Sequence, residues 1–300
     1  MNKKILVWLT LCLIWGSTWL FIKIGLRDLP PISFAALRFG FSALILWAIV
    51  WARNSAIPKS FAEWKMIFIS GITGFSINYS LIFWGEKYIS SGLASVLQAM
   101  IPAFGLVMAH YYLPAEKITW LKALGVAIGI GGVALIFSDQ FKFEGAMALA
   151  GSAAVVTSAF FVSFSNVIVK SGGGKIDPVV ISATQMTVGI VPLFIVGFLW
   201  EGNPLHFHWT KMAALSLAYL VLIGAVVAFS LYYWLIRHWD VTKAMLISLV
   251  TPIIALLLGM ITLGEKLNWR IVAGTLLILA GVGSILGEKF KSGLAPAPET

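Results

Sequence analysis

The sequence predicts an all-α polytopic membrane protein with ten transmembrane helices in two inverted five-helix repeats. Three observations lead to this fold class: the composition, the length of the apolar runs, and a repetition of the sequence about 150 residues apart. Of the 300 residues, 60% are hydrophobic and 11% are charged, whereas a soluble protein carries about a quarter charged residues. A mean hydropathy of +0.95 leaves too little polar surface to cover a water-soluble body.

Apolar runs of roughly 20 residues, the length that crosses a hydrocarbon core of about 30 Å, account for the predicted helices. Charged residues and Pro/Gly clusters separate the runs. The first run is too long for a signal peptide and lacks a cleavage site, so we expect a retained helix. It contains the single cysteine, Cys12, which excludes an intrachain disulfide. We predict helices at residues 5–26, 31–51, 65–85, 91–112, 119–138, 144–169, 178–200, 213–236, 242–263 and 268–286.

The distribution of Lys and Arg predicts the orientation, because cytoplasmic loops carry an excess of these residues. With ten spans, the two termini and the loops after even-numbered spans hold 13 Lys and Arg, and the other loops hold seven. We therefore expect an integral protein of the cell (inner or plasma) membrane with both termini in the cytoplasm. The formal charge of +9 is scattered over these loops without a basic stripe, so no nucleic-acid partner is expected.

The stretch GLASVLQAMIPAFGLVMAHYYLPAEKITW at 92–120 resembles TKAMLISLVTPIIALLLGMITLGEKLNW at 242–269. Pro102 corresponds to Pro252, and Glu116 corresponds to Glu265. The spacing of 150 residues slips to 149 after one deletion. The chain therefore contains the same segment twice.

This repetition predicts the domain organisation. It divides the chain into a first repeat at 1–142 and a second at 143–287, followed by a polar, Pro-rich tail at 288–300 that we expect to be disordered. Five spans per repeat is an odd number, so the second repeat must enter the bilayer from the opposite side. Inverted repeats are typical of secondary transporters, whose substrate site lies between the halves near mid-membrane.

The start of the chain carries a family resemblance. The segment LCLIWGSTWLFIKIGLRDLPPISFAALRF, followed by the duplicated E-K…W…G pattern, resembles the EamA family of the drug/metabolite transporter superfamily over residues 5–286. The resemblance implies a two-fold inverted bundle with a central cavity that exports or imports small metabolites. Members of that family handle amino acids, sugars, nucleobases and drugs, so the resemblance leaves the substrate open.

Polar and aromatic residues near the middle of the predicted spans are the candidate substrate-binding residues. Buried amides are costly in a bilayer, and a mid-span Trp lies outside the interfacial belt where Trp is usually found. A single Ser or Thr also serves commonly as a packing contact between helices. The candidates are Trp15, Thr18, Trp19, Asn78, Tyr79, Gln98, Phe161, Ser230, Tyr233 and Ser248.

Four further residues are candidates for gating or for structure. Pro102 and Pro252 lie about halfway along their spans, where a proline removes one helical hydrogen bond and pushes aside the carbonyl four residues earlier. They either break the helices beside the site or only kink packed helices. Arg38 is a charge within a span and is therefore a functional candidate, although a structural or gating role is favoured. Lys23 lies near a helix end and fits an interfacial position or a role in drawing in a carboxylate.

The residue types that are absent from the span interiors narrow the mechanism. The twelve carboxylates fall in loops, tails or span ends, so the sequence shows no buried proton relay. Coupling would then use the charge of the substrate or a group near a span end. No acid, His or Cys set is assembled at one depth, so we expect no enzyme, no cofactor and no metal site. A passive channel is a weaker alternative, because no ring of charges appears.

The predicted function is secondary transport of a small metabolite. An aromatic, neutral-polar centre with Arg38 and Lys23 on the outer approach suits an amino acid or a related carboxylate, and we expect export. The alternative is export of hydrophobic or cationic drug-like compounds, which Trp side chains bind through cation–π contacts. The expected partners are a small-molecule substrate and the lipid bilayer. A coupling proton or counter-substrate, and the oligomeric state, are left open.

Overall fold

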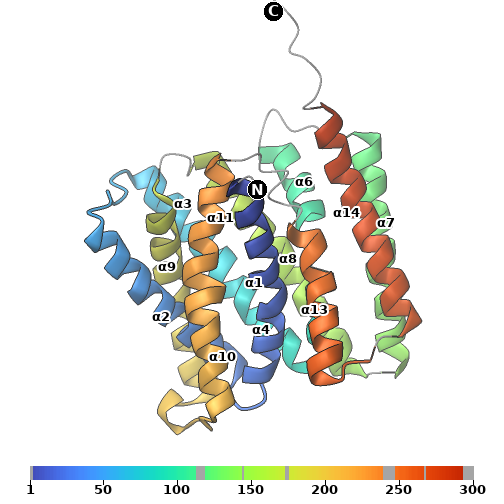
Figure 1. Ribbon diagram of the computed structural model, residues 1–300, viewed down its shortest axis with the longest axis horizontal. Coiled ribbons are helices and arrows are strands. Elements are labelled where there is room, and N and C mark those ends of the chain that lie inside the picture. Colours follow the sequence, from blue (N-terminus) through green and yellow to red (C-terminus); the bar gives the residue numbers. More distant parts are fainter. Residues whose placement is uncertain are drawn as a thin grey trace, which may run out of the picture.

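The computed structural model describes residues 3–112, 119–143, 145–172, 176–238, 247–266 and 268–292. Within these residues the regular elements are all helical (Figure 1). Glu116 of the repeated motif and residues 293–300 of the predicted tail lie outside them. The helices are α1 (Lys3–Gly25), α2 (Pro31–Ala52), α3 (Phe61–Gly71), η1 (Ile72–Ile77), α4 (Asn78–Tyr88), α5 (Ser91–Gln98), α6 (Ile101–Tyr112), α7 (Trp120–Phe143), α8 (Ala146–Gly172), α9 (Pro178–Glu201), η2 (Pro204–His206), α10 (Lys211–Val221), η3 (Leu222–Val227), α11 (Ala228–His238), α13 (Ile247–Leu263) and α14 (Trp269–Ser292).

Within the described residues, seven helical stretches are long and apolar enough to cross a membrane, which makes the chain a polytopic membrane protein. They are Lys3–Gly25, Pro31–Ala52, Phe61–Tyr88, Ser91–Tyr112, Ala146–Gly172, Pro178–Glu201 and Lys211–Leu235. Shorter apolar stretches occupy the other three predicted positions, at Trp120–Ile136, Val250–Leu263 and Trp269–Gly281. The last helix, α14, continues to Ser292, so the predicted disordered tail does not begin at residue 288.

Two of the stretches contain a π-helical turn in the middle. The turn η1 separates α3 from α4, and the turn η3 separates α10 from α11. Residues 72–77 and 222–227 are 150 positions apart, which is the spacing of the sequence repeat. Hydropathy does not predict these turns, because a π turn keeps the apolar composition of the helix around it. Such turns occur frequently at functional sites.

The two mid-span prolines are in different surroundings. The fourth stretch is interrupted between Gln98 and Ile101, and Pro102 is the second residue of α6. A proline in the first turn of a helix is tolerated, because the N–H it lacks has no helical partner there. Pro252 lies inside α13, which is continuous from Ile247 to Leu263. Of the two alternatives, an interrupted helix fits Pro102, and a proline within a packed helix fits Pro252 in the described part of the second half.

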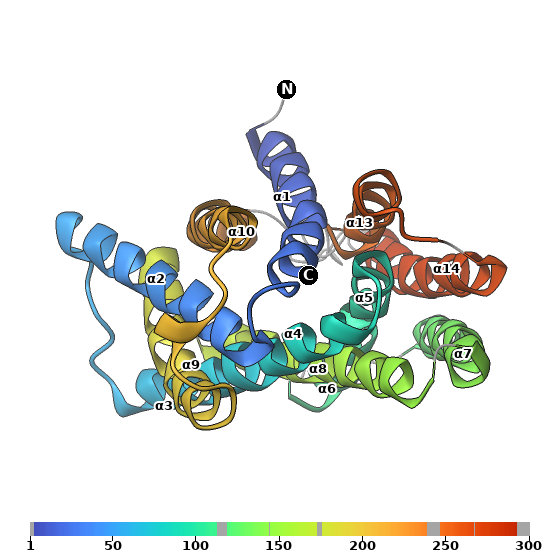
Figure 2. The same cartoon turned by 90° about the horizontal axis from the view of Figure 1, so that it is seen from below.

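The helices form one bundle with a pair of helices at each edge (Figures 1 and 2). The pair α2 and α9 forms one edge, and the pair α7 and α14 forms the other. Between the edges, α4 and α6 pack on α8, while α1 packs on α10, α11 and α13. Each of these contacts joins the N-terminal half of the chain to the C-terminal half.

Glycines allow α7 and α14 to pack with their backbones in contact. A Cβ on Gly132 would lie 2.6 Å from the carbonyl oxygen of Gly274, and a Cβ on Gly274 would lie 2.8 Å from that of Gly132. A Cβ on Gly281 would collide with the carbonyl oxygen of Gly125. Since 125 pairs with 281 and 132 pairs with 274, the two helices run antiparallel. Small residues at helix interfaces are the usual means of close packing in membranes.

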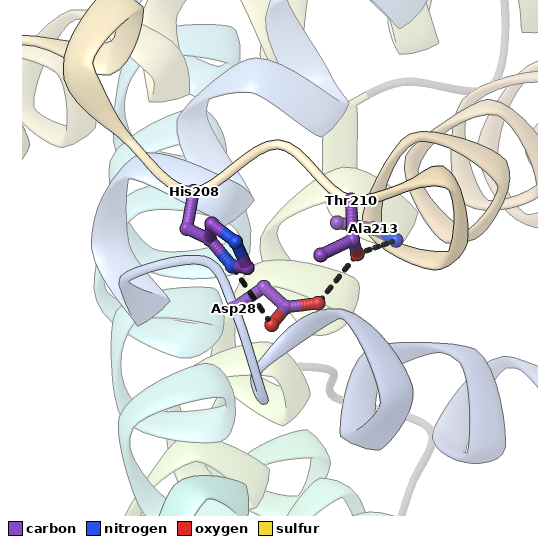
Figure 3. Close-up of polar contacts among 4 residues, drawn as sticks. All are labelled: Asp28, His208, Thr210 and Ala213. Carbon is purple, nitrogen blue, oxygen red and sulfur yellow. Dashed lines mark hydrogen bonds and ion pairs between the residues drawn. The ribbon is translucent and has the colours of Figure 1, made fainter.

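The end of the bundle that carries Asp28, called here the Asp28 end, lies opposite the start of α1 and the end of α14 (Figure 1). Polar contacts between the two halves join their segments at this end. Asp28 accepts a hydrogen bond from the Thr210 hydroxyl at 2.6 Å, and His208 Nδ1 lies 3.4 Å from the same carboxylate (Figure 3). Glu201 accepts from the backbone N–H groups of Ile32 and Ser33 at 3.0 and 2.7 Å.

A third contact at this end involves Glu265, in the segment between α13 and α14. Its carboxylate accepts from the backbone N–H of Ser91 at 2.8 Å, from the Ser91 hydroxyl at 2.7 Å and from the N–H of Gly92 at 3.2 Å. These are orphan donors at the N-terminus of α5, where a negative charge is stabilised by the helix dipole. The repeated Glu of the second half therefore caps a helix of the first half.

Candidate functional site

A cavity of about 190 Å³ lies between the two halves of the chain. By the same measure a single water needs about 10–15 Å³, so the cavity has room for a small organic molecule. Helices α1, α2, α4, α5 and α6 line it from the first half, and α8, α11 and α13 line it from the second. The lining residues are Trp15, Thr18, Trp19, Ile22, Arg38, Asn78, Tyr79, Ile82, Gln98, Ala99, Ile101, Pro102, Val162, Asn166, Phe229, Tyr232, Ile247, Ser248 and Thr251.

Aromatic rings form much of the cavity wall. The ring of Trp15 lies 5.0 Å from that of Tyr232 and 5.8 Å from that of Phe229, in tilted and edge-to-face arrangements. Trp15, Thr18 and Trp19 share one face of α1 because they are three and four residues apart. These ring contacts join α1 of the first half to α11 of the second half.

Arg38 is the charged residue among the described residues that line the cavity. Its side chain is 2% exposed, and its Nη2 donates to the carbonyl oxygen of Gly224 in η3 at 3.1 Å. The guanidinium carbon lies 5.4 Å from the ring centroid of Tyr79. The Nε–H has no partner within the described residues. Arg38 therefore keeps donor capacity that its protein contacts do not use.

The π turn η3 positions the carbonyl oxygen of Gly224 that accepts from Arg38. A Cβ on Gly224 would lie 2.9 Å from Thr18 Cγ2 and 3.4 Å from Arg38 Nη2. Glycine thus lets the backbone of the second half approach α1 and α2 closely. At the equivalent place, Gln185 of α9 donates to the Ser70 hydroxyl at 2.7 Å, beside the start of η1. Each half therefore sends a buried polar side chain toward the π turn of the other half.

Asn78 contributes an unused acceptor. It is 2% exposed, and its Nδ2 donates to the carbonyl oxygen of Gly74 at 3.1 Å. That contact fixes the orientation of the amide, because only the nitrogen can donate to a carbonyl. The oxygen Oδ1 has no hydrogen-bond partner among the described residues. A buried acceptor without a donor is costly, so Asn78 is a cavity-lining residue with an uncompensated oxygen.

Gln98 has its amide nitrogen engaged by α8. Its Nε2 donates to the carbonyl oxygen of Val155 at 3.2 Å and bonds the hydroxyl of Ser158. These contacts hold the last residue of α5 against the second half of the chain. The interruption after Gln98 then lies at the cavity, where Ala99, Ile101 and Pro102 are lining residues.

The structure brings most of the sequence-predicted residues together. The cavity is lined by Trp15, Thr18, Trp19, Arg38, Asn78, Tyr79, Gln98, Pro102 and Ser248. Phe161, Ser230, Tyr233, Lys23 and Pro252 do not line it. Ser230 donates to the carbonyl oxygen of Val226 in η3, and the Tyr233 hydroxyl donates to Gln185 at 2.8 Å.

Sequence reasoning missed other lining residues, including Phe229, Tyr232, Asn166 and Thr251. Phe229 had a signal, because it lies 150 positions after Tyr79 in the repeat. Asn166 is an amide side chain within a predicted span, which is the feature that made Asn78 a candidate. Tyr232 and Thr251 carried no distinguishing pattern, since their place depends on how the helices are rotated about their axes.

Comparison with known proteins identifies the family. Residues 2–138 and 149–287 each match the model of the EamA-like transporter family. The chain belongs to the EamA family. The resemblance drawn from the start of the sequence is thereby confirmed, and the family fits a transporter rather than an enzyme.

Named relatives of this EamA protein span nearly its whole length. An uncharacterized transporter, YoaV of Bacillus subtilis, is 29% identical and covers 94% of this chain and 96% of its own. An uncharacterized transporter of Archaeoglobus fulgidus is 30% identical, over 96% of this chain and 100% of its own. A protein of Escherichia coli named "Probable amino-acid metabolite efflux pump" is 25% identical, over 91% of each chain. A crystal structure with 18% identity superimposes with a TM-score of 0.70 over 99% of this chain and 100% of that one, which supports the same fold.

Proposed function

We propose that this EamA protein is a secondary transporter that moves an amino acid or a related carboxylate by alternating access between two inverted five-helix repeats, 1–142 and 143–287. The observation that carries the proposal is the cavity between the halves. It combines an aromatic wall with two buried polar groups, Arg38 and Asn78, that have unused hydrogen-bonding atoms.

The inverted repeat is supported by the symmetry of the contacts. Exchanging the halves of the chain turns the pair Gly132–Gly274 into the pair Gly281–Gly125, and both pairs are close backbone approaches. The same exchange turns η1 into η3 and leaves the edge pairs α2–α9 and α7–α14 unchanged. Each half also matches the same family model. An exchange that preserves contacts is expected of a two-fold axis, and with an odd number of spans that axis lies in the membrane plane.

The substrate class follows from the unused atoms. A guanidinium is the protein group best suited to bind a carboxylate, and it does so through paired N–H donors. An amide oxygen without a donor accepts from an ammonium group. Arg38 and Asn78 together therefore fit the two charged groups of an amino acid, and the aromatic wall fits its side chain. The name of the Escherichia coli relative agrees with this class and with export.

The alternatives are less well supported. A hydrophobic organic cation would find aromatic rings, but it would share the cavity with the positive charge of Arg38. A passive channel requires a continuous path, whereas the contacts of Asp28, Glu201 and Glu265 close the Asp28 end. Ten spans, with this end outside and both termini in the cytoplasm, agree with the distribution of Lys and Arg.

Exchange across proteoliposomes tests the proposal. The purified protein is loaded with unlabelled amino acids, and uptake of each radiolabelled amino acid is measured as counterflow. We expect saturable exchange for a subset of amino acids. Replacing Arg38 by Gln should reduce that exchange about 10–100-fold, because a hydrogen bond to a charged group contributes about 1.5–3 kcal/mol. Arg27→Gln, at an exposed arginine of the Asp28 end, is the matched control and should exchange normally.

Two results would contradict the proposal. Flux that does not saturate and needs no counter-substrate would indicate a channel. Counterflow of tetraphenylphosphonium in place of any amino acid would indicate the organic-cation alternative. The thermal stability of the Arg38→Gln protein is measured beside the transport, so that loss of folding is distinguished from loss of binding.

A further inference from the structure

Glu86 is a buried carboxylate directly beyond the cavity. Ile82 of α4 lines the cavity, and Glu86 lies one helical turn further toward the Asp28 end on the same face. Its side chain is 0% exposed, and neither carboxylate oxygen has a hydrogen-bond partner within the described residues. Sequence reasoning placed this residue at a span end, where a carboxylate is ordinarily solvated. The structure places it in the core instead.

Lys23 does not supply the missing hydrogen bonds. Its Nζ donates to the carbonyl oxygens of Glu86, Lys87 and Ile89 at 2.7, 3.3 and 2.7 Å. An ammonium group has three donors, so these contacts use all of them. They satisfy carbonyls at the C-terminus of α4, where the helix leaves acceptors without a partner and favours a positive charge. The lysine thus holds the end of the helix, and the carboxylate beside it stays unbonded.

An ionised carboxylate in this position is expensive. Burying a charge without hydrogen bonds costs several kcal/mol even when an opposite charge is near. Among the charges that face it, Lys23 of α1 and Arg38 of α2 favour the ionised form, and Glu265 opposes it. Protonation removes the charge and most of the cost. A proton on Glu86 would therefore fit its buried, unbonded position better than a charge.

The other described elements that pack on α4 bring no further ionisable side chain close to Glu86. On its own helix the ionisable neighbours are Tyr79, Lys87 and Tyr88. Helix α5 and the turn η1, which contact α4, contain no ionisable residue. Helix α8 approaches through Gly151, whose carbonyl oxygen would lie 2.6 Å from a Cβ on Gly85. Its Lys170 is near the far end of that helix.

The repeat indicates that this carboxylate is not needed by the fold. Residues 74–87 correspond to residues 224–237, and the position of Glu86 is occupied by Ile236 in the second half. The same framework is therefore built with an isoleucine at the equivalent place. A buried, unbonded carboxylate that only one half carries indicates a functional role on one side of the membrane.

We infer that Glu86 is a proton-binding site that couples protons to the opening and closing of the Asp28 end. The inference rests on the proposed transport function. When the Asp28 end opens, water reaches the carboxylate and stabilises its ionised form, so the proton leaves. When that end closes, the carboxylate takes up a proton from the same side. A ligand that binds one conformation more tightly shifts the equilibrium toward it, so acid favours closure.

The site suits a proton better than a metal cation. A sodium ion needs several oxygen ligands, but the carbonyl oxygens beside Glu86 are bonded to Lys23. The ammonium group would also repel a second cation. Among the described residues around this position, the Glu86 carboxylate is therefore the group that can bind a proton, without further ligands for a metal cation.

Cysteine labelling tests the coupling without a substrate. In a Cys12→Ser background, Thr18→Cys places a thiol in the cavity, and a membrane-impermeant maleimide is added outside intact cells. Leu205→Cys, at a position 84% exposed at the Asp28 end, gives the rate at which the maleimide labels an exposed thiol at each pH. We expect the ratio of the two rates to fall by several-fold between about pH 8 and pH 5, a range in which the carboxylate of Asp28 stays ionised.

The variant Glu86→Gln, which mimics the protonated form, should give a low ratio at every pH. Glu63→Gln is the matched control, since Glu63 is a carboxylate outside the core, and it should keep the pH dependence. A ratio that responds to pH equally in Glu86→Gln and the parent would overturn the inference. A ratio that depends on sodium rather than on pH would overturn it as well.

Infrared difference spectroscopy is the second measurement, because it keeps the inference testable if Glu86→Gln folds poorly. The closed protein should show the carbonyl stretch of a protonated carboxyl group that titrates with pH, and Glu86→Asp should shift this band. Absence of a titrating band in the folded parent would refute protonation of Glu86. Neither the labelling nor the spectroscopy uses an amino acid. They can therefore refute the role of Glu86 while the counterflow experiment supports transport. If counterflow fails instead, both measurements still test Glu86.

Discussion

At the scale of single residues, two cavity-lining residues carry polar atoms that the described part of the chain leaves without partners. Asn78 Oδ1 and Arg38 Nε are buried and unbonded within the described residues, while neighbouring polar groups such as Gln98 are engaged by α8. The distinction separates atoms that can receive a ligand from atoms that hold the helices together. The sequence identifies the residues that carry both kinds of atom, because amides and cations are costly to bury in a membrane. Only the packing of the helices tells which donors and acceptors are already used.

Replacing Asn78 by Leu tests the unused acceptor. Leucine has the same branched arrangement of heavy atoms and removes the amide oxygen, so we expect the affinity for an amino acid to fall about 10–100-fold, the loss for one hydrogen bond to a charged group. The bond from Nδ2 to Gly74 is also lost, and the thermal stability measures that part. Competition by a carboxylate that lacks the ammonium group should be unchanged.

The control for this prediction is Ser80→Ala, at a nearby position of α4 that does not line the cavity. It should leave both competitors unaffected. Equal loss of the amino acid and of the carboxylate in Asn78→Leu would show that Asn78 shapes the cavity and does not recognise the ammonium group.

At the scale of helices, the sequence predicts positions well and internal irregularities poorly. Apolar length and charge locate the helical stretches, because the bilayer imposes one length on each of them. The π turns η1 and η3 leave no trace in composition. The helix α5 ends at Gln98, and proline chemistry anticipates that interruption. Pro252 follows the other alternative, because a proline inside a transmembrane helix is tolerated where neighbouring groups satisfy the backbone.

Two adjacent glycines of α7 give a matched test of helix packing. A Cβ on Gly132 would lie 2.6 Å from the Gly274 carbonyl oxygen, whereas a Cβ on Gly131 would meet nothing within 4 Å. Gly132→Ala should therefore separate α7 from α14 and destabilise the protein by about 1–3 kcal/mol. Gly131→Ala should be neutral or stabilising by about 0.5–1 kcal/mol, because alanine is the better helix former. The thermal unfolding midpoint of each variant measures the difference.

An equal effect of the two substitutions would mean that α7 and α14 do not pack through their backbones. Gly281→Ala, opposite Gly125, should reproduce the loss seen for Gly132→Ala, because exchange of the halves makes these two contacts equivalent.

At the scale of the whole molecule, closure of one end depends on contacts between residues far apart in the chain. Asp28 and Thr210 come from different repeats, as do Glu201 and Ser33. The sequence predicts that these residues lie in loops on one side of the membrane. It does not predict that they meet, because loop pairing depends on how the two halves are docked. The repeat predicts the symmetry of the bundle, and the docking decides which end is closed.

The contact at Asp28 gives this closure a dependence on acid (Figure 3). The hydrogen bond from Thr210, and then the proximity of His208, lower the pKa of Asp28 below its ordinary value of 3.8. A carboxylate whose pKa is lowered in the folded protein stabilises it above the ordinary value, and the stabilisation is lost as the pH falls through the lowered one. Thr210 also caps α10 by accepting from the N–H of Ala213 at 3.1 Å, so the carboxylate fixes a helix start as well as a loop.

Replacing Asp28 by Asn keeps the shape and removes the charge. We expect the thermal midpoint of Asp28→Asn to lie below that of the parent at neutral pH, and the gap to close as the pH falls below 3.8. Asp28→Ala, which removes the acceptor as well, should also raise the labelling of a cavity cysteine from the Asp28 side, since one of the contacts between the halves is gone. Lys59→Ala, at an exposed position in the segment before α3, serves as the control for both measurements. A gap between Asp28→Asn and the parent that stays constant down to acid pH would mean that the charge of Asp28 does not hold the loops together, and that the closed end depends on Glu201 and Glu265 alone.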